Sequence, residues 1–477
     1  MTFRFEIYSK SSDGFGSGSY APHLLRGASV QIERSLTEGD ILKITSKRKD
    51  MDPQIDKTRP VRFYKDSVKL FDGLLRAPEY TQQYNKLRTL TTTAYSWEKE
   101  LNSIRLPPAG VDYIDKSINF IFNDLCRISN DYGVTKKSLY RYDTSKIPYY
   151  GELSGVFETE ITRTYSGSIW SAMQDLTQAL DTASVNHVWE FALRVDALQS
   201  DFNIYIVPML LKVSDADAAA TFTDPKLILP KNTWRDYRLI NFMDVWGAGL
   251  LKNQIYAPTP ILNETAIPTN EEYFNAAVQP SARHYLLVTV TNPTGTDKTG
   301  SILINGSDDA YPPPPNELSE RFFLQIPAYT ARTHFTDHRY AGLATGALNS
   351  FRADSLSGCT LKVEEVLHGV AGRSINAFGL KRKSVIDSSL DSQTRVNARS
   401  DKAVRLYHAP LIYLEGNIKE DYAVFSDLVG KRVDFYDNFS GAMEAFVCTK
   451  QRLTFAGTQA KMRIEGMRYN IDWEYSE

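Results

Sequence analysis

The sequence predicts a mainly β protein with a smaller α/β part. Aromatic residues make up 12% of the 477 residues, and short segments that alternate apolar and polar residues recur along most of the chain. Aromatic and β-branched residues favour strands, and alternation with a period of two is typical of strands with one buried face. Apolar residues at helical spacing occur at 115–129, 166–181 and 388–410, and these segments account for the α/β part.

Length and charge limit the class of protein. The chain is about three times the roughly 150 residues typical of one domain, so we expect three domains or more. With 55 Lys+Arg against 57 Asp+Glu, the formal net charge is −2. This balance excludes a general nucleic-acid coat and a disordered scaffold.

The sequence shows no targeting segment and no disulfide framework. No window reaches the roughly 18 consecutive apolar residues of a membrane span. The N-terminus, MTFRFEIYSK, alternates like a strand and lacks the apolar core of a signal peptide. Cys126, Cys359 and Cys448 are too scattered for a disulfide framework or a zinc site. We therefore expect a soluble, intracellularly made protein with reduced, mostly buried thiols.

Residues 1–105 predict a β domain. Phe3, Phe5 and Ile7 alternate with polar residues, and further short strands follow up to the Thr-rich segment 87–97. Short strands at regular spacing suggest a barrel or a sandwich. The loop GFGSGS at 14–19 lacks the Lys-Ser/Thr ending and the following helix of a phosphate-binding loop. We therefore expect it to form a hairpin or an inter-subunit loop.

Residues 106–225 predict helices packed on a small sheet. In the segment 166–181 a serine precedes the apolar residues in N-cap position, and the segments 187–196 and 201–208 predict a β-hairpin. The apolar positions at helical spacing are Ile118, Ile121, Phe122 and Leu125 in the first helix and Ile169, Met173, Leu176 and Leu180 in the second.

Residues 250–365 differ in composition from the rest of the chain. They hold 10 of the 21 Pro and are acidic, with 8 Lys+Arg against 12 Asp+Glu. Strand patterns occur at 284–291, 301–306, 321–331 and 359–366. We expect a β-sandwich inserted between two halves of another domain. The segment 388–410 predicts a helix, and an all-β set follows it to the C-terminus.

The two terminal β regions contain a repeat. Residues 61–95 and 433–469 each begin Val-x-Phe-Tyr, continue with a polar turn and an outgoing strand, and end in an alternating strand that finishes on Tyr. We interpret this as an internal duplication.

At this point the chain resembles the baseplate hub, or tail-tip hub, proteins of tailed phages. EGDILKI followed by VRFYKDSVKLFDGLL looks like the opening of these proteins, and TYSGSIWSAMQDLTQAL followed by VWEFALRVD is similar to their helix-then-hairpin module. The order WRDYRLINFMDVWGAG, INAFGLKRKSVIDSS and DLVGKRVDFYD resembles their third part. The resemblance covers residues 1–249 and 366–477, extends to hubs of contractile injection systems, and leaves out 250–365.

The resemblance implies an architecture and a role. It implies a first tube-like β-barrel at 1–105, an α+β connecting domain at 106–225, a second, discontinuous tube-like β-barrel at 226–249 and 366–477, and an inserted β-sandwich at 250–365. Three such chains would make a pseudo-six-fold ring that joins a six-fold tail tube to a three-fold spike or fibre. The expected protein is a homotrimeric, non-enzymatic virion protein at the tail tip. It would line or gate the channel for DNA ejection and would need no cofactor.

The expected partners follow from that position. They are the tail tube or the distal tail protein above, and a spike, fibre or tape-measure protein. DNA would pass without sequence-specific binding. Residues 250–365 would bind another tail protein or a host-surface glycan.

Two basic triplets are the densest positive segments. They are Lys47, Arg48 and Lys49, and Lys381, Arg382 and Lys383. They would face the lumen, contact an acidic neighbouring subunit, or form solvated loop ends. Passage of DNA needs only weak, non-specific attraction, because tight phosphate binding would stall it.

Other candidate sites have ordinary structural explanations. His334 and His338 have a spacing that would ligate a metal on a helix, but their neighbours predict a loop without a third ligand. The carboxylate pairs Asp308-Asp309 and Glu364-Glu365 do not by themselves indicate a catalytic cleft. A cluster of tyrosines fits core or interface packing better than sugar stacking; its members are Tyr140, Tyr142, Tyr149 and Tyr150.

Two alternatives to a trimeric hub remain open. One is a carbohydrate-binding or carbohydrate-cleaving tail protein. The other is the hexameric distal tail protein, which has one tube-like barrel in each chain.

Overall fold

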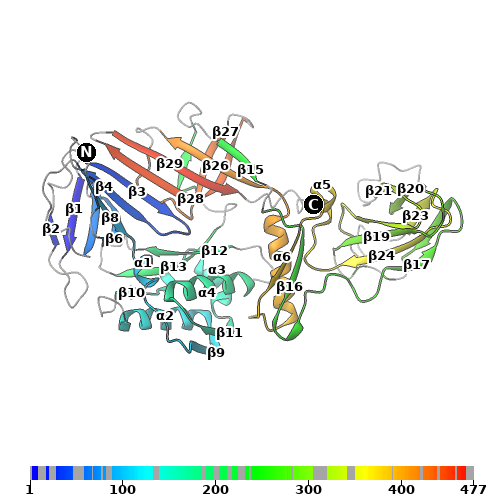
Figure 1. Cartoon of the computed structure of the whole chain (residues 1–477), viewed down its shortest axis with the longest axis horizontal. Coiled ribbons are helices and arrows are strands. Elements are labelled where there is room, and N and C mark those ends of the chain that lie inside the picture. Colours follow the sequence, from blue (N-terminus) through cyan, green and yellow to red (C-terminus); the bar gives the residue numbers. More distant parts are fainter. Residues whose placement is uncertain are drawn as a thin grey trace. The chain divides into compact units, whose positions relative to one another are not determined.

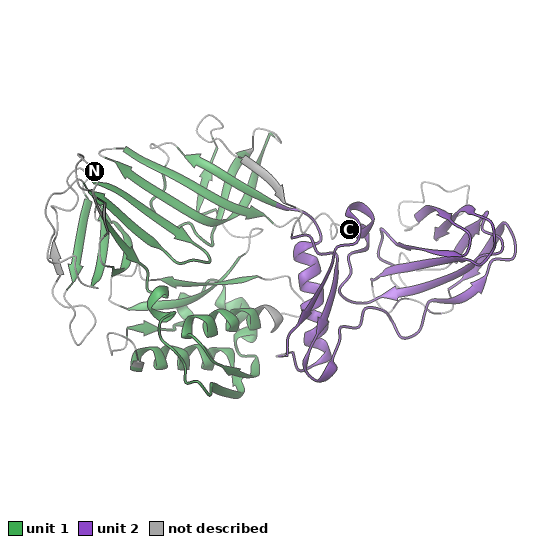
Figure 2. Cartoon of the chain, viewed as in Figure 1, with its two compact units in different colours: residues 1–234, 412–468 green, residues 235–411, 469–477 purple. Residues whose placement is uncertain are grey.

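A computed structural model divides the chain into two compact units (Figure 2). Unit 1 comprises Met1–Trp234 and Ile412–Arg468, and unit 2 comprises Arg235–Leu411 and Tyr469–Glu477. Strands hold 51% of the described residues, which confirms the mainly β prediction. The structure describes residues 3–8, 18–20, 28–46, 59–66, 68–76, 79–81, 89–132, 139–183, 190–196, 203–211, 218–223, 231–235, 238–276, 278, 280, 283–304, 320–340, 350–388, 390–418, 423–437, 441–456 and 459–468.

A 14-stranded sheet forms the frame of unit 1 (Figure 1). Its order is β15-β26-β29-β28-β3-β4-β8-β6-β5-β1-β2, with β7 on β8, β27 on β28 and β14 on β27. The strands are β1 (Phe3–Tyr8), β2 (Gly18–Tyr20), β3 (Ser29–Ser35), β4 (Ile41–Ser46), β5 (Pro60–Lys65), β6 (Val68–Leu75), β7 (Glu79–Thr81), β8 (Thr89–Tyr95), β14 (Ala220–Phe222), β15 (Lys231–Arg235), β26 (Leu411–Ile418), β27 (Arg432–Asp437), β28 (Ala442–Ala456) and β29 (Gln459–Arg468).

One strand pair joins the N-terminal and C-terminal parts of this sheet. β3 pairs antiparallel with β28, from Ser29 opposite Ala456 to Ser35 opposite Lys450. From the sequence these strands are expected in different domains, because alternation reveals a strand but not its partner. Among the described strands the sheet does not close into a barrel.

The two copies of the repeat form strands that pair in the same order. In the first copy β5 pairs with β6 and β6 pairs with β8, all antiparallel. In the second copy β27 pairs with β28 and β28 pairs with β29, again antiparallel. We call β5, β6 and β8 the first strand set, and β27, β28 and β29 the second strand set. Apolar side chains of both sets lie in one core cluster, among them Phe63, Phe71, Phe435 and Phe446.

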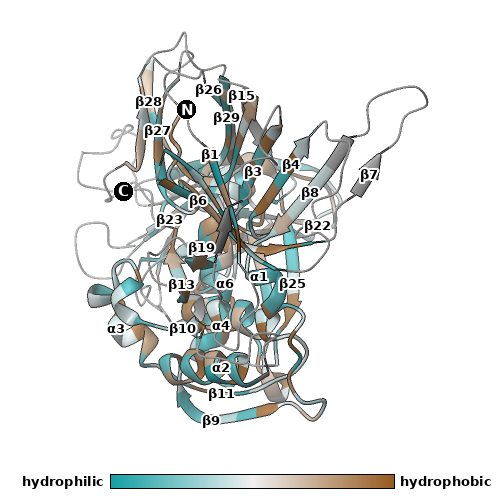
Figure 3. Cartoon of the chain, turned by 90° about the vertical axis from the view of Figure 1, so that its left-hand side faces the viewer, coloured by the Kyte–Doolittle hydropathy of each residue, from teal (hydrophilic) through white to brown (hydrophobic). Residues whose placement is uncertain are grey.

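Helices and short strands follow the first strand set and form an α+β part. Ser168 accepts the backbone N–H of Ser171 and begins the second long helix. In Figure 3 hydrophilic and hydrophobic residues alternate along α2 and α4, as in amphipathic helices. The elements are α1 (Glu98–Leu101), β9 (Val111–Ser117), α2 (Ile118–Tyr132), β10 (Tyr140–Arg141), the 3₁₀ helix η2 (Thr144–Lys146), α3 (Tyr150–Phe157), β11 (Glu160–Tyr165), α4 (Ile169–Ala183), β12 (Phe191–Asp196) and β13 (Ile204–Leu210).

The predicted helix faces and the hairpin of this part are confirmed. β12 and β13 pair antiparallel, and β10 joins them to make a three-stranded sheet. β9 and β11 form a separate pair. Ile118, Ile121, Phe122 and Leu125 are buried in one core cluster with Ile169, Met173, Leu176 and Leu180, and Leu74 and Trp97 from the end of the first strand set belong to the same cluster.

Unit 2 contains a helix beside a parallel strand pair. β16 (Phe242–Trp246) pairs in parallel with β25 (Arg382–Ile386), and α6 (Gln393–Tyr407) packs near β16. Ser392 caps α6 by accepting the N–H of Arg395. The helix predicted at 388–410 is confirmed. Residues 250–365 lie in sequence between the two paired strands, and η3 (Ala248–Leu250) and α5 (Gly372–Phe378) flank them.

Residues 250–365 form two four-stranded sheets around one core. The sheet orders are β17-β24-β19-β22 and β18-β23-β20-β21, and every strand pair in them is antiparallel. The strands are β17 (Leu262–Ala266), β18 (Glu271–Asn275), β19 (Tyr285–Asn292), β20 (Lys298–Ile304), β21 (Glu320–Ile326), β22 (Thr330–Phe335), β23 (Ser350–Asp354) and β24 (Thr360–Val366).

We also searched the described helices for a membrane span. Within the part of the chain that the structure describes, none combines the length and the apolar character needed to cross a bilayer.

Candidate functional site: a buried polar joint

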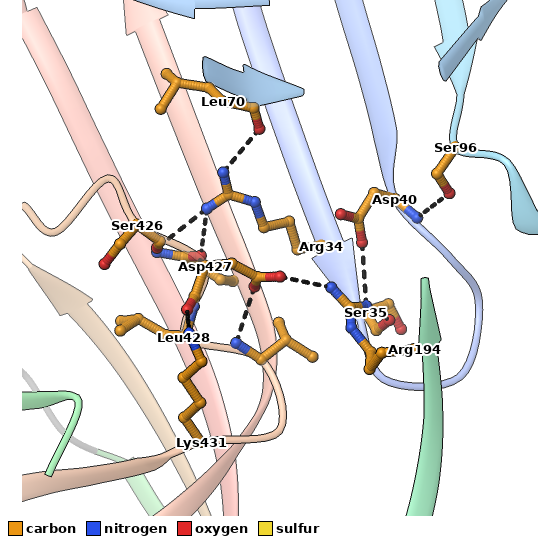
Figure 4. A network of polar contacts seen from close by, with 12 residues as sticks. Arg34, Ser35, Asp40, Leu70, Ser96, Arg194, Ser426, Asp427, Leu428 and Lys431 are labelled. Atoms are coloured by element: carbon orange, nitrogen blue, oxygen red, sulfur yellow. Dashed lines mark hydrogen bonds and ion pairs between the residues drawn. The ribbon is translucent and has the colours of Figure 1, made fainter. Parts of the chain in front are cut away.

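Two arginines are buried in unit 1 where β3, β12 and the segment 423–431 before β27 meet, and two partly exposed carboxylates pair with one of them there (Figure 4). We call Arg34, Asp40, Arg194 and Asp427 the polar joint. Arg34 and Arg194 are only 1% and 4% exposed. Buried charges of this kind are retained in proteins only when they are paired and hydrogen-bonded.

Arg34, near the end of β3, connects four segments. Its Nη1 donates to Oε1 of Gln451 at 2.7 Å and to the carbonyl oxygens of Phe425 and Ser426 at 3.1 Å each. Its Nη2 donates to the carbonyl oxygen of Leu70 at 2.7 Å. Because a guanidinium presents five N–H donors in one plane, a single side chain joins β3, β6, β28 and the segment before β27.

Arg194, on β12, connects the α+β part to two turns of the large sheet. Its Nη1 donates to the carbonyl oxygen of Ser35 at 2.6 Å and to Oδ1 of Asp40 at 3.2 Å. Its Nη2 donates to Oδ2 of Asp427 at 2.8 Å, as the dashed lines in Figure 4 show. The turn after β3 and the turn before β27 are therefore held by one guanidinium.

The two carboxylates of the polar joint differ in proton affinity. Burial raises the pKa of Asp427, but the guanidiniums of Arg194 and Arg34 outweigh it and the pKa lies below its ordinary value. Val429 adds a backbone N–H to Oδ1 of Asp427 at 3.0 Å. For Asp40, burial prevails over the attraction of Arg194, so its pKa lies above the ordinary value. Asp427 accepts more hydrogen bonds than Asp40 and therefore stays ionised to lower pH.

Ser96 and Glu98 extend the network to the end of β8. The backbone N–H of Asp40 donates to Oγ of Ser96 at 2.8 Å, and the backbone N–H of Ser96 donates to the carbonyl oxygen of Asp40 at 2.9 Å. Glu98 is 6% exposed. Burial, with the negative charge of Asp40 added, raises the pKa of Glu98 to about 7.

A cavity of about 190 Å³ adjoins the polar joint. Its lining carries four carboxylates and three cations, so the opposite charges nearly balance and net charge alone favours neither an anion nor a cation. The charged lining residues are Asp40, Asp72, Asp196, Asp427, Lys146, Arg194 and Lys431.

A second buried ion cluster lies within the first strand set. Asp72 on β6 accepts Nε of Arg62 at 2.8 Å and the indole N–H of Trp97 at 3.2 Å. Nζ of Lys69 lies 3.4 Å from the same carboxylate. Burial nevertheless raises the pKa of Asp72 above its ordinary value.

These contacts hold backbone segments together. The polar joint links carbonyl groups and carboxylates from segments up to about 400 residues apart in the sequence. Removing one partner of a buried ion pair typically lowers the free energy of unfolding by about 3–5 kcal/mol, because the other charge stays buried without a counter-charge. The polar joint is therefore suited to keeping the two strand sets and the α+β part in one arrangement.

The polar joint was not predicted from the sequence. Arg34, Arg194 and Asp427 are single charged residues in strands or turns, and nothing in their local pattern separates them from solvated charges. A buried polar position in an otherwise apolar strand face was the only available signal. Residue 34 shows it weakly, since it shares a strand face with Val30 and Ile32.

The predicted basic triplets have different outcomes. Lys47, Arg48 and Lys49 lie outside the described residues. Lys381–Lys383 are exposed at the start of β25. Arg382 donates from Nε to Oδ2 of Asp244 at 2.6 Å, and its guanidinium lies 5.2 Å from the ring centroid of Phe242. Arg382 therefore helps to hold β25 against β16, and a lumenal role for this triplet stays a prediction.

The predicted loop is confirmed for His338 and is wrong for His334. His334 is on strand β22, opposite Val288 of β19, and its ring stacks on Phe322 with centroids 4.2 Å apart. His338 follows in the next turn. Pairing with β19 imposes the strand, and local residue types do not reveal this pairing. Within the described residues, no group of three or more His, Cys, Asp or Glu side chains is placed to hold a metal ion.

The tyrosine cluster packs against the core of the α+β part. Tyr140 is 1% exposed, and Tyr142, Tyr149 and Tyr150 are partly buried against the same core. Tyr142 stacks on Phe122 with ring centroids 5.0 Å apart. The packing interpretation is confirmed, and these rings do not form an exposed platform for sugars.

The remaining predicted features are located as follows. Cys126, Cys359 and Cys448 are free and buried, as expected. Gly18–Tyr20 of the glycine-serine segment pair with β1 as a hairpin strand, whereas residues 14–17 lie outside the described residues. Asp308 and Asp309 also lie outside the described residues. Glu364 lies 2.8 Å from Nζ of Lys362, and Glu365 lies 2.7 Å from Nδ1 of His284.

Comparison with known proteins gives a fold. No protein-family model matches the chain, and no curated protein matches it. Among solved structures, the tail protein from Neisseria meningitidis MC58 matches with a TM-score of 0.50 and 9% identity, covering 99% of this chain and 98% of that one. The chain has the fold of a tail protein. At the level of the fold, this supports the resemblance to phage tail proteins seen in the sequence.

Two further tail proteins are similar at lower scores. The 43 kDa tail protein of prophage MuSo2 from Shewanella oneidensis has a TM-score of 0.49 and 8% identity, covering 98% of each chain. The prophage tail protein gp18 from Listeria monocytogenes EGD-e has a TM-score of 0.42 and 7% identity, covering 99% of this chain and 98% of that one.

The Neisseria match extends beyond the resemblance seen in the sequence. Since it covers 99% of this chain, it includes residues 250–365, which the sequence resemblance leaves out.

Proposed function

We propose that this chain is a hub protein at the tail tip or baseplate of a phage-like particle, and that three copies form its ring. The observation that carries the proposal is the repeat in the large sheet: the first and second strand sets pair in the same order within one chain. Two equivalent sets in each of three chains supply six similar elements. Such a ring matches a six-fold tail tube on one side and a three-fold spike or fibre on the other.

In this proposal the two strand sets belong to two tube-like barrels that are completed by neighbouring subunits. Among the described strands, β2 and β15 end the strand order of the sheet. Exposed strand edges promote unwanted association unless another chain covers them. Pairing between subunits would cover these edges and line a central channel.

The proposed role is mechanical and needs neither catalysis nor a cofactor. The ring holds the channel closed until the host is engaged, and then lets the tape-measure protein and DNA pass. The net charge of −2 suits passage without tight phosphate binding. The polar joint keeps the two strand sets in register while the ring carries load.

The proposed location is the virion tail tip, or the equivalent place in a contractile injection system. The proposed neighbours are the tail tube or distal tail protein on one side, and a spike, fibre or tape-measure protein on the other. Residues 250–365 form the inserted domain, which would contact another tail protein or a host-surface glycan.

Absolute mass in solution tests the ring. One chain has a mass of 53.9 kDa, so a trimer measured by light scattering has about 162 kDa, three times that value. A hexamer, at twice the trimer mass, would favour a distal tail protein instead. A monomer at all concentrations would contradict a ring that forms from this chain alone. Release of reducing ends from host polysaccharide would contradict the non-enzymatic role.

A further inference from the structure

Unit 2 contains a cavity of about 200 Å³ with a strongly basic lining. Arg283 comes just before β19, Arg339 follows β22, and Arg405 lies on α6. His284 and His368 complete the basic side chains of the lining. Strand ends of the two-sheet part and the helix beside β16 therefore bring three arginines and two histidines to one cavity.

Two carboxylates orient the imidazoles. Oδ2 of Asp401, which lies in the lining, is 2.8 Å from Nδ1 of His368, and its Oδ1 accepts the backbone N–H of Gly369 at 2.8 Å. Behind His284, Oε1 of Glu365 lies 2.7 Å from Nδ1. Since Nδ1 of each ring is engaged by a carboxylate, Nε2 is the nitrogen through which each ring can meet a ligand.

The cavity has a positive net charge. Its lining has three arginines against one aspartate, and even with Glu365 added the guanidiniums outnumber the carboxylates. This holds with both imidazoles neutral, and protonation of either one increases the excess. Apolar walls formed by Val366, Val370 and Val404 lower the local dielectric constant and strengthen attraction for an anion.

The guanidiniums come from three different elements. That of Arg339 lies 4.7 Å from the ring centroid of Tyr285, a cation–π contact that orients its plane. Planar guanidiniums bind oxyanions through paired N–H donors. Arginines that come from three separate elements can donate to an anion from several directions, which suits the oxygens of a tetrahedral anion better than the two coplanar oxygens of a carboxylate.

We propose that this cavity binds a phosphate group. Its volume of about 200 Å³ is smaller than the roughly 300–1,000 Å³ of pockets for drug-sized ligands. The ligand is therefore a single phosphate group, either free or as part of a sugar-phosphate or polyol-phosphate unit. This site is independent of the hub role and of the polar joint in unit 1.

Calorimetric titration of the full chain tests the site. The buffer contains chloride as its only anion at low ionic strength, and the probes are inorganic phosphate, glycerol phosphate and glucuronate. We expect saturable binding of phosphate, with Arg283→Gln and Arg405→Gln each weakening it at least tenfold. Arg332→Gln, which changes an exposed arginine of β22 outside the lining, is the matched control and should leave binding within twofold.

The outcomes distinguish free phosphate from a phosphate group within a larger molecule, and they distinguish phosphate from a carboxylate. Tighter binding of glycerol phosphate supports a phosphate within a larger molecule, and tighter binding of inorganic phosphate supports the free ion. Absence of saturable binding to the natural chain, or binding by both variants equal to that of the control, would overturn the proposal. Tighter binding of glucuronate than of phosphate would overturn the phosphate class. Arg283 is exposed, so its variant keeps the test valid if Arg405→Gln unfolds the chain.

Discussion

The first and second strand sets share a sequence pattern but differ in how many of their faces are buried. Every residue of β6 from Leu70 to Leu75 is buried, whereas along β27 buried and partly exposed residues alternate. The cause is the α+β part, whose core includes Leu74 from the first set and Trp97, which follows β8. Among the residues that the structure describes, none of the second set belongs to that cluster.

The second buried face changes the role of a charged residue at the same place in the repeat. The motif Val-x-Phe-Tyr has Arg62 in the first set and Asp434 in the second. Arg62 is 5% exposed and paired with Asp72 on the neighbouring strand, whereas Asp434 pairs with Arg432 on its own strand, at 2.7 Å, and both remain partly exposed. The repeated sequence pattern therefore determines where the strands form. The part of the chain that covers a strand determines whether a charged side chain on it is buried in an ion pair.

The largest expected effect comes from breaking the buried pair of the first set. Asp72→Ala leaves Arg62 and Lys69 buried without their shared carboxylate. We expect a loss of about 3–5 kcal/mol in the free energy of unfolding. Denaturant unfolding of the purified chain measures it. A loss below about 1 kcal/mol would show that the second face of β6 is hydrated in solution.

A smaller loss is expected where β6 pairs with β8. A Cβ added to Gly73 would lie 2.2 Å from the carbonyl oxygen of Tyr95, so the two strands would have to move apart. Gly73→Ala should cost about 1–3 kcal/mol, as overpacking in a core does. Gly155→Ala on α3 is the control, because its Cβ would meet open space. Equal melting temperatures for the two variants would contradict the close approach of Gly73 to Tyr95.

A pH-dependent effect is expected at Glu98, the first residue of α1, which follows the first strand set. Its folded pKa of about 7 lies above its ordinary value of 4.5. The folded chain then holds a proton that the unfolded chain has lost, so the contribution to stability is full below pH 4.5 and is lost as pH rises through 7. Glu98→Gln should therefore gain stability relative to the natural chain between pH 5 and pH 8, by at least about 1 kcal/mol.

Thermal unfolding of both chains across this pH range measures the difference. Glu152→Gln, which removes an exposed carboxylate from α3, sets the baseline. A difference between Glu98→Gln and the natural chain that does not change with pH would rule out a titrating Glu98.

The smallest effect is expected in the second set. Asp434→Ala removes a partly exposed pair within β27, and such pairs contribute less than about 1 kcal/mol. The measurement is the same denaturant unfolding as for Asp72→Ala. A loss as large as that of Asp72→Ala would mean that a partner covers β27 in solution, for example in the proposed ring.

Much of the local structure could be predicted from the sequence. Apolar residues at helical spacing identified α2, α4 and α6, and alternation identified β12, β13, β19 and β24. Local side-chain periodicity is sufficient for this because it records which side of an element faces a core. The candidate site could not be predicted in the same way, since Arg194 contacts Asp40 and Asp427 across 154 and 233 residues of sequence.

The sequence by itself determined the strand and helix content, the repeat at 61–95 and 433–469, and the separate composition of residues 250–365. Only the tertiary structure decided that Ser35 lies opposite Lys450, that Arg34 and Arg194 are buried, and that three arginines of unit 2 meet at one cavity. The physical reason is that backbone ladders use the same N–H and C=O groups at every residue. The sequence of a strand therefore shows which of its faces is buried but not which strand it pairs with. The residues around a charged side chain in the sequence do not show whether it is buried.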